Sequence, residues 1–164
     1  MKFNELYKSI KEVEKYTDIL EKVINEYENI IIIGNGGSNS IASHIAQDYT
    51  KMLDKKAISF SDSSRLTCYI NDYGRDRAYV EFLKDFADKE TLVILISSSG
   101  NSMNVFNCAV YCKSLNISML LLSGFDKNNK LNSFDGGKFK CWVDSHDYGV
   151  VEVSHLVFLH SILK

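Results

Sequence analysis

Two short loops rich in glycine and serine each follow a run of apolar residues, and both have the composition of anion-binding loops. The isoleucines at 30–33 lead into the GNGGS segment at 34–38, and the apolar run at 92–96 leads into the SSSGNS segment at 97–102. When a buried strand ends in such a loop and a helix follows, backbone N–H groups and hydroxyls point at one spot, which suits a phosphate. Two such loops in one small sheet predict a phosphorylated ligand held between them.

The two loops differ in how specific their sequences are. The first is not the GxGxxG dinucleotide fingerprint, because that spacing fails at Asn39, and it lacks the Gly-Lys-Ser/Thr ending of a Walker A loop. A tight strand-to-helix turn that uses glycine for backbone freedom explains it equally well. In the second loop, hydroxyls and helix N-terminal amides can coordinate a phosphate monoester without a lysine, although a serine-rich turn with one helix cap is the alternative. Its hydroxyls belong to Ser97, Ser98, Ser99 and Ser102.

Titratable side chains recur at helical spacing in two segments. His44 and Asp48 are four residues apart and share a helix face, so they are either metal ligands, a carboxylate base beside a histidine, or a solvated surface pair. Glu152 and His160 lie along one side of the last predicted helix, where eight residues rise by about 12 Å, near the limit at which both reach one ion. Either the helix begins irregularly at Glu152, or Glu152 and His160 do not bind the same metal ion. His155 is equally well a packed or partner-facing histidine.

Asn71 and Asp72 stand beside each other in the loop region expected after the second predicted strand. An amide next to a carboxylate suits the hydroxyl groups of a sugar. An Asx turn that ends at Gly74 explains the same two residues equally well. Asn71 and Asp72 are therefore either a candidate sugar contact or part of an Asx turn.

Four cysteines are present, and none of them forms a CxxC pair. Cys108 and Cys112 lie one helical turn apart, a spacing compatible with metal ligands or with a reactive pair. We favour buried small hydrophobic residues in a reducing cytosol for all four.

The elements that position these residues alternate between strands and helices. Residues 3–27 have apolar side chains every three or four positions and predict one long amphipathic helix. Ser102 is expected to cap the helix that follows the serine loop. The expected strands are 30–33, 57–60, 92–96, 117–122 and 139–143, and the expected helices are 38–52, 66–70, 76–87, 102–114 and 149–163, with a loop or short helix in 125–138.

This alternation predicts an α/β three-layer sandwich, in which helices cover both faces of a parallel sheet. We expect five strands in flavodoxin-like order. In such folds ligands bind at the carboxyl ends of the strands, near the switch in strand order, and both small-residue loops belong there.

Length and composition indicate one domain over residues 1–164 with no marked bias. Of the 164 residues, 45% are apolar and 24% are charged, as in ordinary globular proteins. The net charge of −2 gives no sign of nucleic acid or an anionic membrane as a partner. The apolar runs are shorter than the roughly 20 residues that cross a bilayer, and the N-terminus is polar rather than signal-like.

Together these residues resemble the SIS (sugar isomerase) domain and, more narrowly, the sedoheptulose-7-phosphate isomerases, also called phosphoheptose isomerases. The similarity extends from about Ile30 to the C-terminus. A single one of these sequence motifs is weak evidence, but all of them in the same order identify the domain. In chain order the marks are GNGGS at 34–38, His44, SDSS at 61–64, NDYG at 71–74, SSSGNS at 97–102, LSG at 122–124, and the helix with Glu152, His155 and His160.

The resemblance implies a cytoplasmic aldose–ketose isomerase that forms homotetramers, has active sites at subunit interfaces and often binds zinc. Such enzymes convert sedoheptulose 7-phosphate to D-glycero-D-manno-heptose 7-phosphate through a cis-enediol, for lipopolysaccharide or capsule biosynthesis. Two alternatives stay open. One is a non-catalytic SIS module that binds a sugar phosphate or a protein partner, and the other is an isomerase of another capsule sugar phosphate.

The resemblance also implies roles for single residues. Asp48 falls at the position of the general base and His160 at that of the general acid. A divalent metal is expected at His44, Asp48, Glu152 and His160. Substrate contacts are expected from Asn35, Gly36, Gly37, Ser38, Asp48, Asn71, Asp72, Ser97, Ser98, Ser99, Ser102 and Glu152.

Two of these positions depart from the pattern of the family. Asp48 stands in place of the usual glutamate, and the shorter side chain retracts the base by about 1 Å, enough to slow proton transfer about 10²-fold. Glu152 stands in place of the usual glutamine. It adds a negative charge, which favours a divalent cation but raises the cost of an enediolate nearby.

Overall fold

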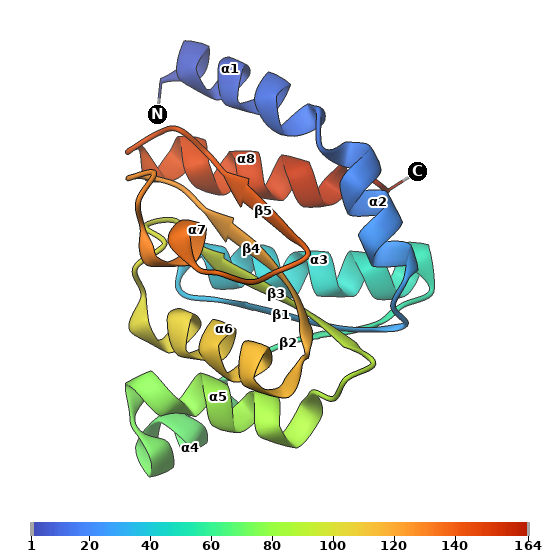
Figure 1. The fold of residues 1–164 in the computed structure, drawn as a ribbon, viewed down its shortest axis with the longest axis vertical. Coiled ribbons are helices and arrows are strands. Elements are labelled where there is room, and N and C mark those ends of the chain that lie inside the picture. Colours follow the sequence, from blue (N-terminus) through green and yellow to red (C-terminus); the bar gives the residue numbers. More distant parts are fainter. Residues whose placement is uncertain (1, 164) are drawn as a thin grey trace.

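Five runs of mainly apolar residues form one parallel sheet in the computed structural model, which describes residues 2–163. The strand order is β2-β1-β3-β4-β5, the flavodoxin-like order that the sequence predicts, and the α/β fold class is confirmed (Figure 1). The strands are β1 (Asn29–Gly34), β2 (Lys56–Ser59), β3 (Thr91–Ser97), β4 (Ser118–Ser123) and β5 (Phe139–Trp142).

Helices cover both faces of the sheet (Figure 1). One face carries α1 (Phe3–Glu14), α2 (Thr17–Asn25), α3 (Gly37–Leu53) and α8 (Tyr148–His160). The other carries α4 (Ser63–Tyr73), α5 (Arg75–Phe86), α6 (Met103–Leu115) and the short α7 (Lys130–Ser133). Because side chains alternate along a strand, Ile30 and Ile32 enter the first core and Ile31 and Ile33 the second. This double burial explains the unbroken apolar run of β1.

The predicted helix of residues 3–27 is two helices with a bend between them (Figure 1). Tyr16 leaves the helical region with φ −103° and ψ 4°. Its ring packs on Phe139, 5.1 Å between centroids, and the Thr17 hydroxyl donates to the Glu14 carbonyl at 2.9 Å. The apolar spacing continues across the bend, so periodicity alone could not reveal it.

Helix α4 is longer than expected, and it takes Asn71 and Asp72 out of the loop where we had expected them. Its start is fixed by Asp62, whose carboxylate accepts from Arg65 N at 2.8 Å. It ends at Gly74, which has a positive φ of 76°. The two residues therefore lie in the last turn of a helix.

The carboxyl ends of β1 and β3 lie side by side, because these strands pair directly and Gly34 is in register with Ile96. The chain goes from β1 to one side of the sheet and from β3 to the other, so the switch in strand order falls between them. The GNGGS and SSSGNS loops therefore leave the sheet at one edge, as predicted.

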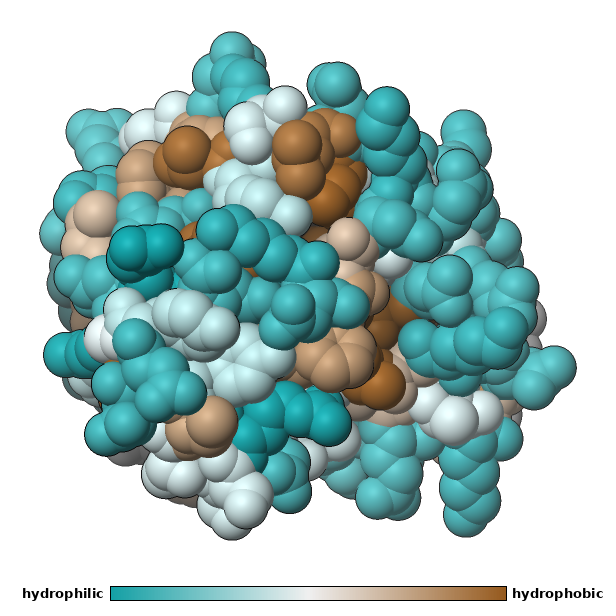
Figure 2. Space-filling model, turned by 90° about the horizontal axis from the view of Figure 1, so that it is seen from below, coloured by the Kyte–Doolittle hydropathy of each residue, from teal (hydrophilic) through white to brown (hydrophobic). Residues whose placement is uncertain are grey.

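The face of the molecule seen in Figure 2 is mainly hydrophilic with scattered apolar patches. Figure 2 shows such patches on the side of the molecule where α4 and α5 lie. Ile70 and Phe86 on this side are 38% and 43% exposed, and Phe3 on α1 is 76% exposed. No helix within residues 2–163 has the length and apolar character needed to cross a membrane.

Candidate functional site

A pocket of about 240 Å³ opens where β1 and β3 end. Both predicted loops line it, together with the start of α8. The two loops predicted to bind an anion are thus brought together within one chain. The lining residues are Asn35, Gly36, Gly37, Ser38, Ser97, Ser98, Ser99, Ser102, Tyr148 and Glu152.

Two glycines of the first loop have distinct roles. Gly36 has a φ of 53°, which L side chains rarely adopt. A Cβ on Gly37 would lie 2.3 Å from Oε2 of Glu152. Glycine at this position therefore lets α8 bring the Glu152 carboxylate against the start of α3.

Hydroxyls and helix starts supply the donors of the pocket. The Ser97 hydroxyl is 3.2 Å from that of Ser102, and the Ser38 and Ser98 hydroxyls are 3.5 Å apart. Ser102 has the extended backbone of an N-cap, as predicted, but its side chain makes no cap bond. Within the described chain, the starts of α3 and α6 are both without a side-chain cap, which leaves their N-terminal amides for an anion.

The pocket contains one acid and, among residues 2–163, no lysine or arginine lines it. The Ser98 hydroxyl donates to Oε1 of Glu152 at 3.5 Å. Burial raises the pKa of Glu152, while this hydrogen bond acts in the opposite direction. An anion that entered the pocket would therefore meet neutral donors beside a carboxylate.

A second group of chemically active side chains lies where α3 and α8 pack together. His44 and Asp48 come from α3 and His160 from α8, and they offer ligand atoms within 4.8 Å of one another. Oδ2 of Asp48 is 3.0 Å from Nε2 of His160 and 3.4 Å from Nε2 of His44. The two imidazole rings meet edge to face, 5.0 Å between centroids. The sequence prediction that these residues converge from two helices agrees with this geometry.

A buried tyrosine holds the two helices together beside this group. The Tyr49 hydroxyl donates to the carbonyl oxygen of Leu159 at 2.9 Å, and both residues are fully buried. The reactive side chains themselves are open to solvent: His44 is 52%, His160 34% and Asp48 17% exposed. The backbone that carries the cluster is therefore fixed by a buried hydrogen bond, while the reactive side chains remain accessible to solvent.

The chemistry of the cluster fits a metal ion or an acid–base pair. Two imidazole nitrogens and one carboxylate oxygen form a common three-ligand set for zinc that keeps a position open for substrate. A carboxylate beside a histidine also suits general acid–base catalysis. The donor set therefore fits the predicted divalent metal with three of its four expected ligands.

Glu152, the fourth predicted ligand, is not brought to the cluster. Helix α8 is regular from Tyr148 to His160, so Glu152 lies about 12 Å of helix rise from His160. Its carboxylate is placed against Gly37 in the pocket instead. The expected four-residue set is divided between two places in this chain.

Asn71 and Asp72 also lie apart from the pocket. Both are exposed on α4, and Nδ2 of Asn71 donates to Oδ1 of Asp72 at 2.9 Å. The Cys68 thiol contacts the other carboxylate oxygen of Asp72 at 3.5 Å. Within the described residues the structure therefore places this pair outside the pocket lining.

Three of the other candidates from the sequence are structural. Cys108 and Cys112 are buried, and burial raises the pKa of both thiols, that of Cys112 to about 12, so neither is a reactive thiol. Cys141 is buried as expected, but Cys68 is exposed, so the expectation that all four cysteines are buried is wrong for Cys68. His155 is fully buried, and its Nε2 lies 3.1 Å from the carbonyl oxygen of Ser123. Burial lowers the pKa of His155 to about 4, so this histidine is neutral at pH 7 and Nε2 is the donor.

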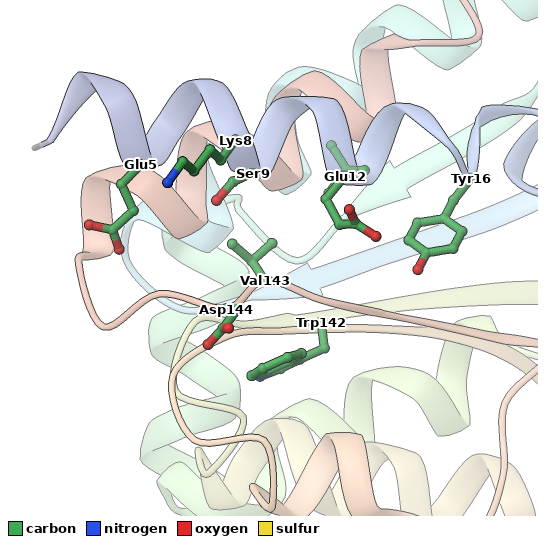
Figure 3. Close-up of a pocket in the computed structure, with 9 residues that line it drawn as sticks. Glu5, Lys8, Ser9, Glu12, Tyr16, Trp142, Val143 and Asp144 are labelled. Carbon is green, nitrogen blue, oxygen red and sulfur yellow. The ribbon is translucent and has the colours of Figure 1, made fainter.

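A different cleft, of about 470 Å³, lies between α1 and the end of β5 (Figure 3). Trp142 faces it from below, and Glu5 and Glu12 face it from the helix (Figure 3). Glu12 pairs with Lys15 at 2.6 Å, and Glu5 accepts from the Ser145 hydroxyl. The charges of this cleft are partly paired, and its lining includes none of the predicted site residues.

Sequence reasoning missed three residues at the pocket. Tyr148 lines it, and Tyr79 and Asn104 contact Asn35 there. Tyr148 follows Asp147, which caps α8 by accepting from Gly149 N at 2.8 Å. Asp147 is a typical N-cap residue, so the sequence could have placed the start of the last helix at Tyr148, next to the strand ends. No sequence signal identified Tyr79, whose side chain reaches Asn35 from α5.

Comparison with known proteins points to one family. The model of the SIS domain family matches residues 4–124. A phosphoheptose isomerase from Fusobacterium nucleatum is 31% identical over 99% of this chain and 85% of its own length. One from Helicobacter pylori is 34% identical over 87% of this chain and 76% of its own. The solved phosphoheptose isomerase from Neisseria gonorrhoeae has a TM-score of 0.82 at 25% identity, covering 97% of this chain and 91% of that one.

Proposed function

From the premise that the chain belongs to the SIS domain family, and within it to the phosphoheptose isomerases, we propose that it interconverts sedoheptulose 7-phosphate and D-glycero-D-manno-heptose 7-phosphate. The coarser conclusion, a sugar phosphate isomerase, follows from membership itself. The heptose substrate is proposed on the names of the relatives. A cytoplasmic location and a role in lipopolysaccharide or capsule biosynthesis belong to the same proposal.

One observation of the structure supports this function above the others. A pocket of neutral donors and a His–Asp–His cluster lie along the same helix pair, with the pocket at the starts of α3 and α8 and the cluster further along both helices. The first suits the phosphate group of a substrate, and the second suits proton transfer at its reactive carbons. A module that only binds sugar phosphates needs the pocket but has no need of the cluster.

In the proposed mechanism, Asp48 removes the proton from C1 of the ketose, and the electron pair of the C–H bond forms the C1–C2 double bond. His160 donates a proton to the oxygen on C2, which gives a cis-enediol. The aldose forms when a proton is returned to C2 and the oxygen on C1 loses its proton. Asp48 and His160 are already 3.0 Å apart, so both can reach neighbouring atoms of one sugar.

A divalent metal, with zinc as the first candidate, is part of the proposal. His44, Asp48 and His160 would hold it, and when bound it would polarise the sugar carbonyl. Asp48 and His160 would each serve as metal ligand or as proton carrier at a given step, not as both at once. Elemental analysis of purified protein is expected to find about one metal per chain in wild type and much less in His44→Ala. Equal metal content in both proteins would reject this site.

We also propose a homotetramer with active sites at subunit interfaces. Exposed apolar side chains on α1 support it, because Phe3 and Tyr7 are 76% and 64% exposed. A groove next to His160, lined by Ile10, Val13 and Val157, lies on the same side of the molecule. Light scattering on the purified protein measures the mass, and a monomer at micromolar concentration would reject the tetramer.

Product analysis across a panel of sugar phosphates tests the function directly. We expect NMR to detect the aldose when sedoheptulose 7-phosphate is supplied with a divalent metal. If only a different sugar phosphate is turned over, the protein is still an isomerase but its substrate is not sedoheptulose 7-phosphate. Binding without turnover of any member of the panel would favour the non-catalytic module.

A further inference from the structure

The amide group of Asn35 is held in place by two buried side chains at the edge of the pocket. Its Oδ1 accepts from Asn104 Nδ2 and from the Tyr79 hydroxyl, each at 2.8 Å, and its Nδ2 donates to Asn104 Oδ1 at 3.0 Å. Asn104 is 3% and Tyr79 4% exposed. The side chain of Asn35 is therefore fixed, although it belongs to a glycine-rich loop.

These contacts connect three elements around the pocket. Asn35 lies between β1 and α3, Tyr79 on α5, and Asn104 in the first turn of α6, directly after the serine loop. The reciprocal amide pair therefore joins the two loops that form the pocket. The Tyr79 hydroxyl also approaches the carbonyl oxygen of Gly34 at 3.3 Å, where β1 ends.

The tyrosine that orients this network is itself held by aromatic packing. The ring of Tyr79 meets that of Phe60 edge to face, 5.2 Å between centroids. Phe60 in turn stacks on Phe82 at 4.3 Å. The hydroxyl thus has little freedom to move away from Asn35, and buried polar networks with every partner in place are rigid.

We propose that Asn104 and Tyr79 are positioning residues, which hold Asn35 and the first loop in the arrangement that binds the phosphate group of the substrate. A side-chain amide has two N–H hydrogens, and the contacts within residues 2–163 use one of them on Nδ2 of Asn35. The network leaves the second hydrogen for a ligand in the pocket that Asn35 lines. The inference rests on the proposed function for the identity of the substrate.

The effect of losing this network falls on binding rather than on turnover. The network holds Asn35, which lines the pocket, and the pocket lining includes none of the three residues of the His–Asp–His cluster. Phosphate contacts are the same in the bound substrate and in the transition state, so their loss raises KM and leaves kcat unchanged.

The test compares two variants that each remove one hydroxyl. Tyr79→Phe removes the donor to Asn35 and keeps the ring against Phe60. Tyr69→Phe is the matched control, because Tyr69 also packs on Phe60, at 5.5 Å, but its hydroxyl donates to Asp85 outside the pocket. We measure kcat and KM on the turned-over sugar phosphate, and the Kd of inorganic phosphate by calorimetry.

We expect Tyr79→Phe to raise both KM and the phosphate Kd about tenfold, which corresponds to about 1.4 kcal/mol, with kcat within twofold of wild type. Tyr69→Phe is expected to leave all three unchanged. In an Asn35→Ala background, Tyr79→Phe is expected to add less than twofold. An unchanged phosphate Kd in Tyr79→Phe, or a full tenfold effect in the Asn35→Ala background, would overturn the proposal.

Two further measurements keep this test independent of folding and of the proposed function. If Tyr79→Phe does not fold, Asn104→Ser is measured in its place, with the same expected rise in Kd. If wild type turns over no sugar phosphate, the proposed function fails, while the phosphate Kd still decides the role of Tyr79 and Asn104.

Discussion

The pocket at the strand ends and the His–Asp–His cluster both use residues of α3 and α8 but are built in opposite ways. The pocket is made from backbone, small side chains and buried hydrogen bonds such as that from Tyr79 to Asn35. The cluster consists of three titratable side chains that are partly open to solvent, with His44 52% exposed. A phosphate needs many weak donors in fixed positions, whereas proton transfer needs a few titratable groups that substrate can reach.

If the pocket binds phosphate and the cluster transfers protons, as proposed, binding and chemistry are expected to fail separately in this molecule. A change at the pocket should then alter affinity, and a change at the cluster should alter the rate of the chemical step. Helix α8 is the common element, because it contributes Glu152 to one region and His160 to the other. The predictions below therefore separate the two regions or disturb both through α8.

The largest effect is expected from Asp48→Asn. The variant keeps the size of the side chain but removes the base, so kcat should fall about 10³-fold, within the range for general acid–base catalysis. Substrate binding, measured by calorimetry, should change by less than threefold because the pocket is untouched. A comparable loss of affinity would mean that the two regions do not act separately.

The next effect is on stability at low pH, and it comes from the buried His155 on α8, outside both regions. Burial lowers the pKa of this histidine to about 4 from 6.5, so between these pH values the unfolded chain binds a proton that the folded chain does not. The free energy of unfolding should therefore fall as pH drops from 6.5 towards 4, by about 1.4 kcal/mol per unit and roughly 3 kcal/mol in total.

Urea unfolding at pH 7 and pH 5 measures this dependence. His155→Gln is the control, because it has no proton to gain and should show a clearly smaller change between the two pH values. An equal change in both proteins would assign the pH dependence to other groups.

A smaller effect is expected from Glu152→Gln, which changes only the charge in the pocket. The wild-type carboxylate repels a dianionic phosphate, so its removal should tighten the binding of inorganic phosphate about tenfold, a change of about 1.4 kcal/mol. Calorimetry at pH 7.5 checks this. Weaker binding in the variant would show that Glu152 supports the ligand, for instance through a metal.

The smallest effect is expected from Tyr49→Phe, which loosens the cluster end of the helix pair. The hydroxyl bonds to Leu159 next to His160, and a buried hydrogen bond of this kind contributes about 1 kcal/mol to stability. Thermal unfolding should show that loss, and kcat should fall a few-fold with the phosphate Kd unchanged. A change in phosphate affinity instead would contradict the assignment of Tyr49 to the cluster.

The sheet and the pocket loops were predictable from sequence because local patterns determine them. Buried strands have continuous apolar runs, and the strand-to-helix loops have small residues, so the region 30–38 could be placed correctly. The bend at Tyr16 could not be predicted, since it depends on the contact with Phe139, far along the chain. Local spacing contains no information about that contact.

The site was predictable in part for the same reason. The pair His44 and Asp48 follows from helical spacing, and their meeting with His160 agrees with the resemblance to the family. The place of Glu152 was not predictable, because it depends on how closely α8 approaches Gly37. The contacts of Tyr79 and Asn104 require the packing of α5 and α6 around the loop, which only the folded chain shows.

Proton NMR of sedoheptulose 7-phosphate with the purified, metal-supplied enzyme in deuterated water tests the central claim most directly, because it follows the carbon-bound protons themselves. The account predicts loss of one proton signal at C1 and formation of the aldose, with solvent deuterium entering at C2. Retention of both C1 protons with no aldose formed, under conditions where phosphate binds to the pocket, would contradict it.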